Sequence, residues 1–177
     1  MFKTIVLAVL FALLAFLGYV STRESTFAFE RSGVINAPAE KIFPYISSFQ
    51  MCKMWNPYDN KDPNMKRNIM GTDGQVGSVM EFEGNTEAGS GKLEILKIVP
   101  NASVEIKLTM TKPIHANNII LYKLTPEGTG TRFTWAMSGD NGFMGKLISV
   151  FIDCEKMMAK DFDQGITQLK TIVETQK

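Results

Sequence analysis

The one histidine of the chain, His115, is the side chain best suited to acid–base catalysis. The pKa of an imidazole lies near neutrality, so it can both accept and release a proton at physiological pH. His115 follows Pro113 at the expected start of a strand, and a histidine in such a position more often has a surface role. We therefore assign no catalytic residue and keep His115 only as a candidate.

Motifs of several common enzyme classes are missing from the sequence. No Gly-x-Ser-x-Gly elbow surrounds a serine, and neither a Walker sequence nor a dinucleotide-binding fingerprint occurs. The His, Cys and carboxylate residues do not have metal-ligand spacing, so we expect neither a metal site nor a cofactor. Cys52 and Cys154 are too few for a disulfide framework, and both free thiols and a single bridge stay open.

Apolar binding is the chemistry that the composition favours, because the chain has eleven methionines and twelve phenylalanines. Methionine adapts its shape to varied partners, so surfaces rich in it suit apolar ligands. The alternative is that these side chains fill an irregular core. The chain carries 19 basic and 18 acidic residues without a long run of one sign, a balance that argues against nucleic acid as the partner.

The segment 4–20 is uncharged and almost wholly apolar. As a helix rising about 1.5 Å per residue it covers most of a hydrocarbon core roughly 30 Å thick. We expect residues 1–24 to be an uncleaved single-pass membrane anchor; a cleaved signal sequence and a buried domain helix are the alternatives. Bulky Tyr19 and Val20 stand where a signal sequence needs small residues. Lys3, before the span, favours a domain on the non-cytoplasmic side of the membrane.

Residues 25–177 have the size of one domain. Asn36 is expected to cap a helix that Pro44 then kinks or shortens, and Gly165 lets a sheet residue or a ligand approach a long final helix. The order of elements predicts an α+β fold, in which the last helix covers one face of a curved antiparallel sheet. Strands are expected over 27–35, 77–83, 92–99, 103–111, 116–124 and 131–137, and helices from 37, within 51–63, and over 142–150 and 153–174.

Several short motifs resemble the polyketide cyclase/dehydrase branch of the START-like (SRPBCC) superfamily, in its membrane-anchored bacterial form. The resemblance covers roughly 27–174 and implies a helix-grip fold, a sheet wrapped around the C-terminal helix with an apolar tunnel between them. Relatives bind lipids, sterols, polyketides or other apolar molecules, and only some are enzymes, so the family name is not evidence of cyclase activity. The matching motifs are Arg31 with Val34-Ile35-Asn36-Ala37-Pro38, Trp55-Asn56-Pro57-Tyr58, Gly128-Thr129-Gly130-Thr131 with Trp135, and Lys160-Asp161-Phe162 with Gly165.

We therefore predict a START-like domain that binds a hydrophobic small molecule or a lipid in an apolar cavity at the membrane. Trp55 is predicted to gate the tunnel mouth or, alternatively, to pin its loop in place. Two other functions stay open: a cyclase or dehydratase with His115 or Asp140 lining the cavity, and a ligand-free, membrane-tethered interaction domain. The predicted cavity lining consists of Ile106, Met110, Tyr122, Trp135, Met137, Met158, Phe162 and Ile166.

Overall fold

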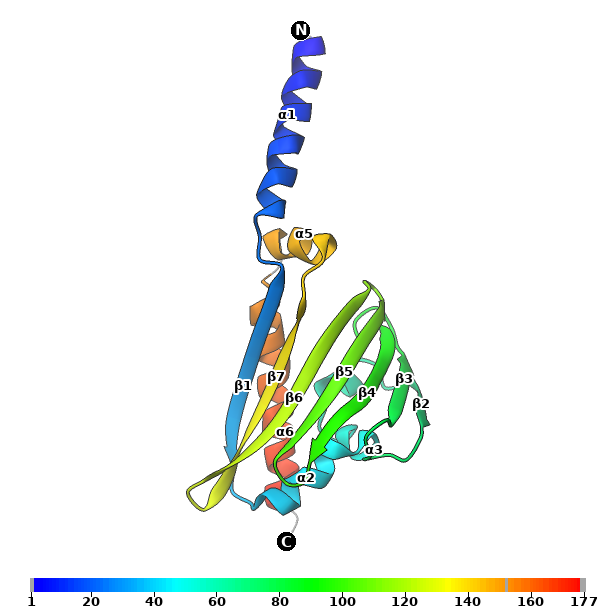
Figure 1. Ribbon diagram of the computed structural model, residues 1–177, viewed down its shortest axis with the longest axis vertical. Helices are drawn as coiled ribbons and strands as arrows, with labels where there is room; N and C mark the ends of the chain where they lie inside the picture. The colour runs from blue at the N-terminus through cyan, green and yellow to red at the C-terminus, as the bar shows by residue number, and fades with distance from the viewer. Residues whose placement is uncertain (1, 152, 176–177) are drawn as a thin grey trace.

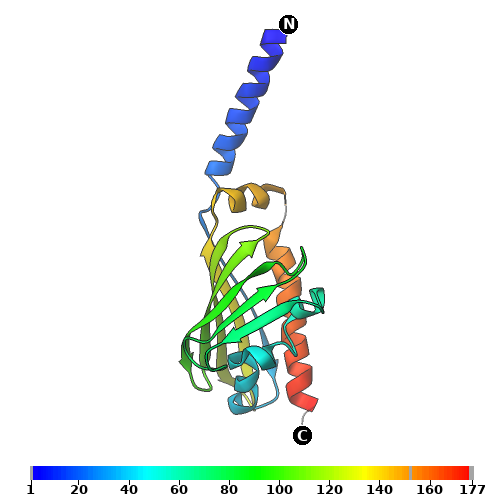
Figure 2. The same cartoon turned by 90° about the vertical axis from the view of Figure 1, so that its right-hand side faces the viewer.

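A seven-stranded antiparallel sheet forms the centre of the computed structural model, which describes residues 2–151 and 153–175. The strand order is β1-β7-β6-β5-β4-β3-β2, so the first strand pairs with the last. The sheet curves along its length (Figures 1 and 2). The strands are β1 (Thr26–Ile35), β2 (Lys66–Met70), β3 (Val79–Glu83), β4 (Ser90–Val99), β5 (Ser103–Lys112), β6 (Ala116–Glu127) and β7 (Gly130–Asp140).

The long helix α6 (Cys154–Thr175) packs along the sheet, and its contacts with β1 and β7 place it inside the curve (Figure 2). The short helices α2 (Ala39–Ser47) and α3 (Phe49–Cys52) lie at the end of the sheet away from the N-terminus (Figure 1), and α4 (Pro57–Lys61) packs against α6. This arrangement confirms the predicted α+β helix-grip fold.

Helix α6 lies close to the sheet because two glycines leave room for it. A Cβ atom built on Gly165 would lie 2.8 Å from Cζ3 of Trp135, and one on Gly33 of β1 would lie 2.7 Å from Cγ2 of Ile166. The close approach expected at Gly165 is therefore made by a sheet residue. Both glycines act through the absence of a side chain rather than through an unusual backbone angle.

The N-terminal helix α1 (Phe2–Ser21) projects from the domain, and Val20 is its buried residue (Figure 1). It has 20 residues and a mean hydropathy of 2.4, and only 6% of its most apolar stretch is buried. The alternative of a buried domain helix is therefore wrong. The helix is long and apolar enough to cross a membrane, and a signal sequence has the same properties.

The N-cap predicted at Asn36 is wrong, because α2 begins later. Pro38 occupies the cap position with an extended ψ of 155° and makes no side-chain cap hydrogen bond. The backbone N–H of Asn36 instead donates to Oε1 of Glu174 at 2.7 Å, which ties the chain to the end of α6. Pro44 lies inside α2, which ends at Ser47, in line with the predicted shortening.

Two stretches of the sheet differ from the prediction. Strand β2 was not expected, because its short polar sequence has no clear alternation and its place at the edge of the sheet comes from pairing with β3. Strand β6 runs on through Pro126 to Glu127, beyond its expected end at residue 124. The chain reverses only at Gly128, whose φ of +59° suits a glycine in the tight connection to β7.

Candidate functional site

We call the space between the concave face of the sheet and α6 the grip. Its half near α2 and α3 is filled by aromatic side chains. Trp135 of β7 stacks on Phe162 of α6 with ring centroids 4.0 Å apart and planes inclined by 12°. The ring centroids of Tyr122, Phe133 and Trp135 each lie within 5.7 Å of that of Trp55, in edge-on arrangements. Such geometries add to the free energy gained from burial. We call Trp55, Tyr122, Phe133, Trp135 and Phe162 the aromatic cluster; all five are at least 97% buried.

Trp55 lies at the centre of the aromatic cluster and is fully buried. Its indole N–H donates to the carbonyl oxygen of Tyr45 in α2 at 2.8 Å. These are the contacts expected of a side chain that pins the loop between the short helices and the sheet. The role of Trp55 as a gate stays a prediction.

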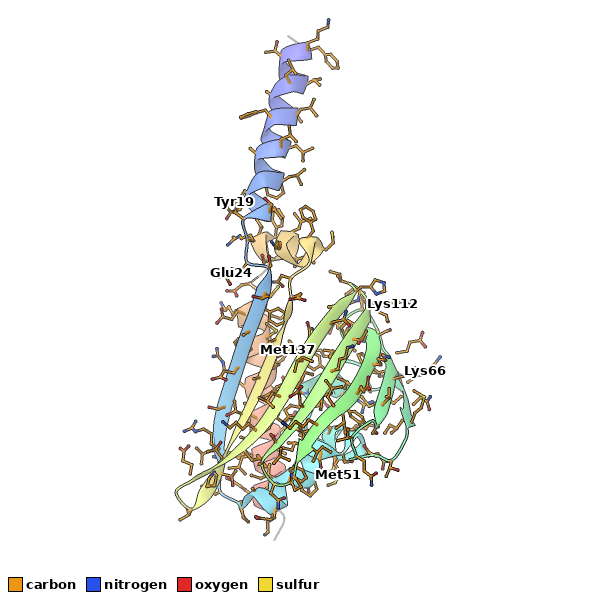
Figure 3. The ribbon with its side chains drawn as sticks, viewed as in Figure 1. Tyr19, Glu24, Met51, Lys66, Lys112 and Met137 are labelled. Carbon is orange, nitrogen blue, oxygen red and sulfur yellow. The ribbon has the colours of Figure 1, made fainter. Side chains whose placement is uncertain are left out.

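The half of the grip nearest α5 (Phe143–Phe151) is lined by apolar side chains that are only half-buried. Met137 lies three residues before the end of β7 (Figure 3). Met158 lies in the first turns of α6. Leu108 of β5 is half-buried as well. We call Leu108, Met137 and Met158 the open half. It joins the aromatic cluster through the buried residues Ile106 and Ile120, which pair across β5 and β6.

Seven of the eight predicted lining residues belong to one continuous apolar cluster between the sheet and α6. Met110 is the exception: a Cβ atom on Gly89 would lie 2.7 Å from its Cε, so this side chain lies over the turn between β3 and β4. Whether these residues contact a ligand stays a prediction. The seven are Ile106, Tyr122, Trp135, Met137, Met158, Phe162 and Ile166.

Two buried polar atoms of the concave face have no hydrogen-bond partner within the described part of the chain. One is Nε1 of Trp135, in a side chain that is 2% exposed, and the other is Oδ1 of Asn118 on β6. The Asn118 amide lies over Gly139 of β7, where a Cβ atom would come within 2.1 Å of Oδ1. Native proteins rarely leave such groups unpaired, because each costs about 1–3 kcal/mol when buried alone.

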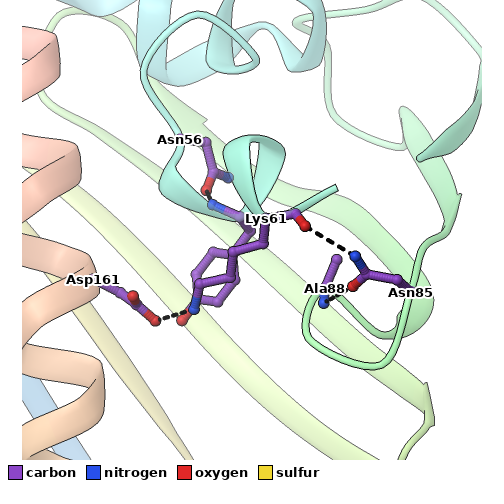
Figure 4. Close-up of polar contacts among 6 residues, drawn as sticks. Asn56, Lys61, Asn85, Ala88 and Asp161 are labelled. Carbon is purple, nitrogen blue, oxygen red and sulfur yellow. Dashed lines mark hydrogen bonds and ion pairs between the residues drawn. The ribbon is translucent and has the colours of Figure 1, made fainter. Parts of the chain in front are cut away.

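A polar contact closes one side of the grip by joining α4 to α6. Nζ of Lys61 donates to Oδ2 of Asp161 at 2.6 Å and lies 4.5 Å from the ring centre of Tyr58 (Figure 4). Burial and the neighbouring Asp161 carboxylate raise the pKa of the Tyr58 hydroxyl. On the other side of α4, Nδ2 of Asn85 donates to the carbonyl oxygen of Lys61 at 2.9 Å. Helix α4 thus fastens the turn between β3 and β4 to α6.

Sequence reasoning missed this contact, because Lys61 and Asp161 lie one hundred positions apart. The motif that contains Asp161 was recognised only as part of a family resemblance. A carboxylate beside Phe162 on the buried stripe of α6 was the signal that could have found it, because a buried Asp needs a partner.

The two cysteines are both free. Burial is the main cause that raises the pKa of the Cys52 thiol to about 12, against the opposing hydrogen bonds to Tyr122 and Asn56. A thiol with so high a pKa is a poor nucleophile at neutral pH. Among the described residues, no group of three or more His, Cys, Asp or Glu side chains is arranged to hold a metal ion.

The polar residues considered for catalysis lie on the surface. His115 is exposed in the connection between β5 and β6, and Asp140 is exposed at the end of β7. The structure does not bring these side chains together, and their catalytic role stays a prediction.

Two surface hollows lie near the α1 end of the domain. One of about 470 Å³ lies at the junction of α5 and α6, around Phe151 and Cys154. The other, of about 760 Å³, runs across the ends of β1, β5, β6 and β7 and has a polar border that includes Glu24, Lys107 and Asp140. Both hollows lie on the outer surface of the domain. Neither is lined by Leu108, Met137 or Met158, which pack between the sheet and α6.

Known proteins share this architecture. The model of the family described as "Polyketide cyclase / dehydrase and lipid transport" matches residues 26–174. Norcoclaurine synthase from Thalictrum flavum is 13% identical, with a TM-score of 0.62 over 86% of this chain and 88% of that one. Protein MLL2253 from Mesorhizobium loti is 17% identical, with a TM-score of 0.62 over 86% and 98%. The Aha1 dimer from Colwellia psychrerythraea is 19% identical, with a TM-score of 0.60 over 85% and 98%.

No protein of curated description matches the chain. At these identities the similar structures show the fold alone. The family match carries more weight, because it extends from the first strand to the end of α6. The chain therefore belongs to the polyketide cyclase/dehydrase and lipid transport family, within the SRPBCC superfamily that its motifs resemble.

Proposed function

We propose that the protein binds an apolar small molecule or a lipid between the sheet and α6, beside a membrane to which α1 attaches it. The observation that carries the proposal is the open half, where Leu108, Met137 and Met158 are apolar but only half-buried. An apolar ligand that covers them removes their surface from water, at about 0.8 kcal/mol for each CH2 group buried. The loss of freedom on association opposes this gain.

The ligand carries at least one polar group as well as an apolar body. The unpaired N–H of Trp135 needs an acceptor, and the unpaired Oδ1 of Asn118 needs a donor. A hydroxyl group can meet either need, and a carboxylic acid or an amide offers both. The structure of norcoclaurine synthase is a complex with dopamine and hydroxybenzaldehyde, small molecules of this mixed character.

The membrane attachment is supported by the length, hydropathy and exposure of α1. Lys3 precedes the span, which favours a domain on the non-cytoplasmic side. A tether of this kind keeps the grip within reach of lipids, so a ligand of low solubility need not diffuse through water.

Native mass spectrometry of the full chain in a mild detergent tests the binding function. We expect the protein to carry a stoichiometric small molecule, which extraction then identifies. Met137→Lys should abolish its retention, because the substitution places a charge in the open half. Met54→Lys is the matched control, since Met54 is 54% exposed and lies outside the apolar cluster. A ligand-free mass for the wild-type chain after incubation with membrane lipid extract would contradict the proposal.

A further inference from the structure

We propose that α5 is an interfacial helix, which lies in the surface of a lipid bilayer beside the end of α1 and holds the open half of the grip against the lipid. This inference rests on the proposed attachment of α1 to a membrane. It adds a second, separate contact with the bilayer and assigns that contact to the helix between β7 and α6.

The apolar face of α5 packs against very little of the domain. None of its nine residues is buried. Phe143 and Met144 are each 52% exposed, and Phe151 is 74% exposed. One side of the helix carries these three side chains together with the half-buried Leu147 and Ile148. The opposite side carries Gly145, Lys146 and Ser149. A soluble domain rarely leaves such a face open to water.

Contacts with α1 place α5 at a definite depth. The ring of Phe151 lies 6.1 Å from the ring of Phe16, and Nζ of Lys146 donates to the carbonyl oxygen of Ser21 at 3.3 Å. Phe16 precedes Ser21, the last residue of α1, by five positions, or about 7.5 Å along the helix. Interfacial helices bury their apolar face about 5–10 Å into the boundary between headgroups and acyl chains. If α1 spans the bilayer, Phe151 therefore lies at this depth.

The residues that follow Phe16 fit the same boundary. Tyr19 is half-exposed at the end of α1 nearest the domain (Figure 3), and the guanidinium of Arg23 lies 5.2 Å from its ring centre. Tyrosine and arginine are common at the level of the lipid headgroups. Because Glu24 and Asp153 offset Arg23 and Lys146, the face has little net charge and suits a zwitterionic lipid.

The position of α5 connects this contact to binding. Helix α5 joins the end of β7 to the start of α6, and Met137 and Met158 lie close to those two ends. A bilayer that covers the apolar face of α5 thus lies next to the open half. An amphiphile can then pass between lipid and grip with its apolar part shielded from water for most of the way.

Fluorescence quenching in vesicles tests the proposal on the full chain. Tryptophan is introduced singly as Phe143→Trp or Phe151→Trp, and the protein is reconstituted in phosphatidylcholine that carries bromine at defined acyl carbons. The native Trp55 and Trp135 are at most 2% exposed, and their signal is subtracted from the wild-type protein. Leu14→Trp reports on α1, and Thr129→Trp, in the exposed turn between β6 and β7, reports on the far end of the domain.

We expect both α5 probes to lose fluorescence, most strongly with bromine close to the headgroups, and Leu14→Trp to be quenched most strongly by deeper bromine. Thr129→Trp should not be quenched. Quenching of Leu14→Trp without quenching of either α5 probe would overturn the proposal and leave the anchor in place. A blue-shifted α5 probe that bromine does not quench would also overturn it, because a protein partner or a second copy would then cover the face. Absence of quenching at Leu14→Trp would overturn the membrane attachment and this proposal together.

Discussion

The two halves of the grip share one sheet and one helix, but they are built differently. In the half near α2, five aromatic side chains fill the interior and Gly165 lets α6 approach the ring of Trp135. In the half near α5, methionines and Leu108 line the same two surfaces and are only half-buried. We infer a division of work from the comparison: the aromatic cluster holds α6 against the sheet, and the open half is where we propose that a ligand binds.

The sharpest way to break this comparison is Trp55→Ala. Removal of a fully buried indole that contacts three other rings and donates a hydrogen bond to Tyr45 should lower the free energy of unfolding by about 3–5 kcal/mol. Urea denaturation, with the near-ultraviolet circular dichroism of the aromatic cluster as the signal, measures the change. Trp55→Phe, which keeps a ring but loses the donor, should retain most of the stability. A loss below about 1 kcal/mol for Trp55→Ala would show that the cluster does not hold the fold together.

Gly165→Ala tests the same half by adding one methyl group. In an exposed helix this change stabilises by about 1 kcal/mol. Here the new Cβ would lie 2.8 Å from the Trp135 ring and 3.0 Å from Cδ of Pro57, neither of which can rotate away. We expect a net loss of about 1–3 kcal/mol in the free energy of unfolding, by the same denaturation assay.

Gly145→Ala is the matched control, because Gly145 lies in α5 and meets only the flexible end of Asn141, at 3.2 Å. It should be neutral or mildly stabilising. Equal behaviour of the two variants would mean that α6 can move away from the sheet without loss.

The residues of this comparison differ in how far the sequence predicts them. The alternation of Val104, Ile106 and Leu108 is local, so it predicts both the strand β5 and its buried face. The long stripe of α6 was equally readable. The limits of β2 and β6 could not be predicted from the sequence, because strand pairing rather than composition decides where an edge strand begins and where a hairpin turns.

The polar parts of the site were hidden for a related reason. The contact between Lys61 and Asp161, and the lack of partners for Trp135 Nε1 and Asn118 Oδ1, depend on side chains that come together only in the folded molecule. The helix α5 was expected from its periodicity, but an apolar face usually predicts burial. That this face stays exposed is a property of the tertiary arrangement.

Alkaline pH should lower the free energy of unfolding through the half of the grip that holds the aromatic cluster. The Cys52 thiol, against Tyr122, has its pKa raised to about 12 by burial, from 9.0 in the unfolded chain. Above pH 9 the unfolded state loses this proton while the folded state keeps it, so stability falls with rising pH. The slope approaches about 1.4 kcal/mol for each pH unit between the two values.

Urea denaturation from pH 8 to pH 11 measures this slope, and Cys52→Ala should make it shallower. If the slope is unchanged in Cys52→Ala, the loss of stability at alkaline pH comes from other groups, such as the buried hydroxyl of Tyr58, whose pKa is also raised.

The smallest effect on stability is expected in the open half, and there it separates stability from binding. Met158→Ala removes a side chain that is only half-buried, so less apolar surface is lost from the core than at Trp55. We expect the free energy of unfolding to fall by about 1 kcal/mol or less, below the 2–5 kcal/mol typical of a fully buried methionine. Retention of the bound small molecule, measured by native mass spectrometry, should nevertheless fall, because the proposed binding site loses one of its three apolar side chains. A large loss of stability with unchanged retention would reverse the assignment: Met158 would then belong to the packing that holds α6, and the ligand would have to bind elsewhere.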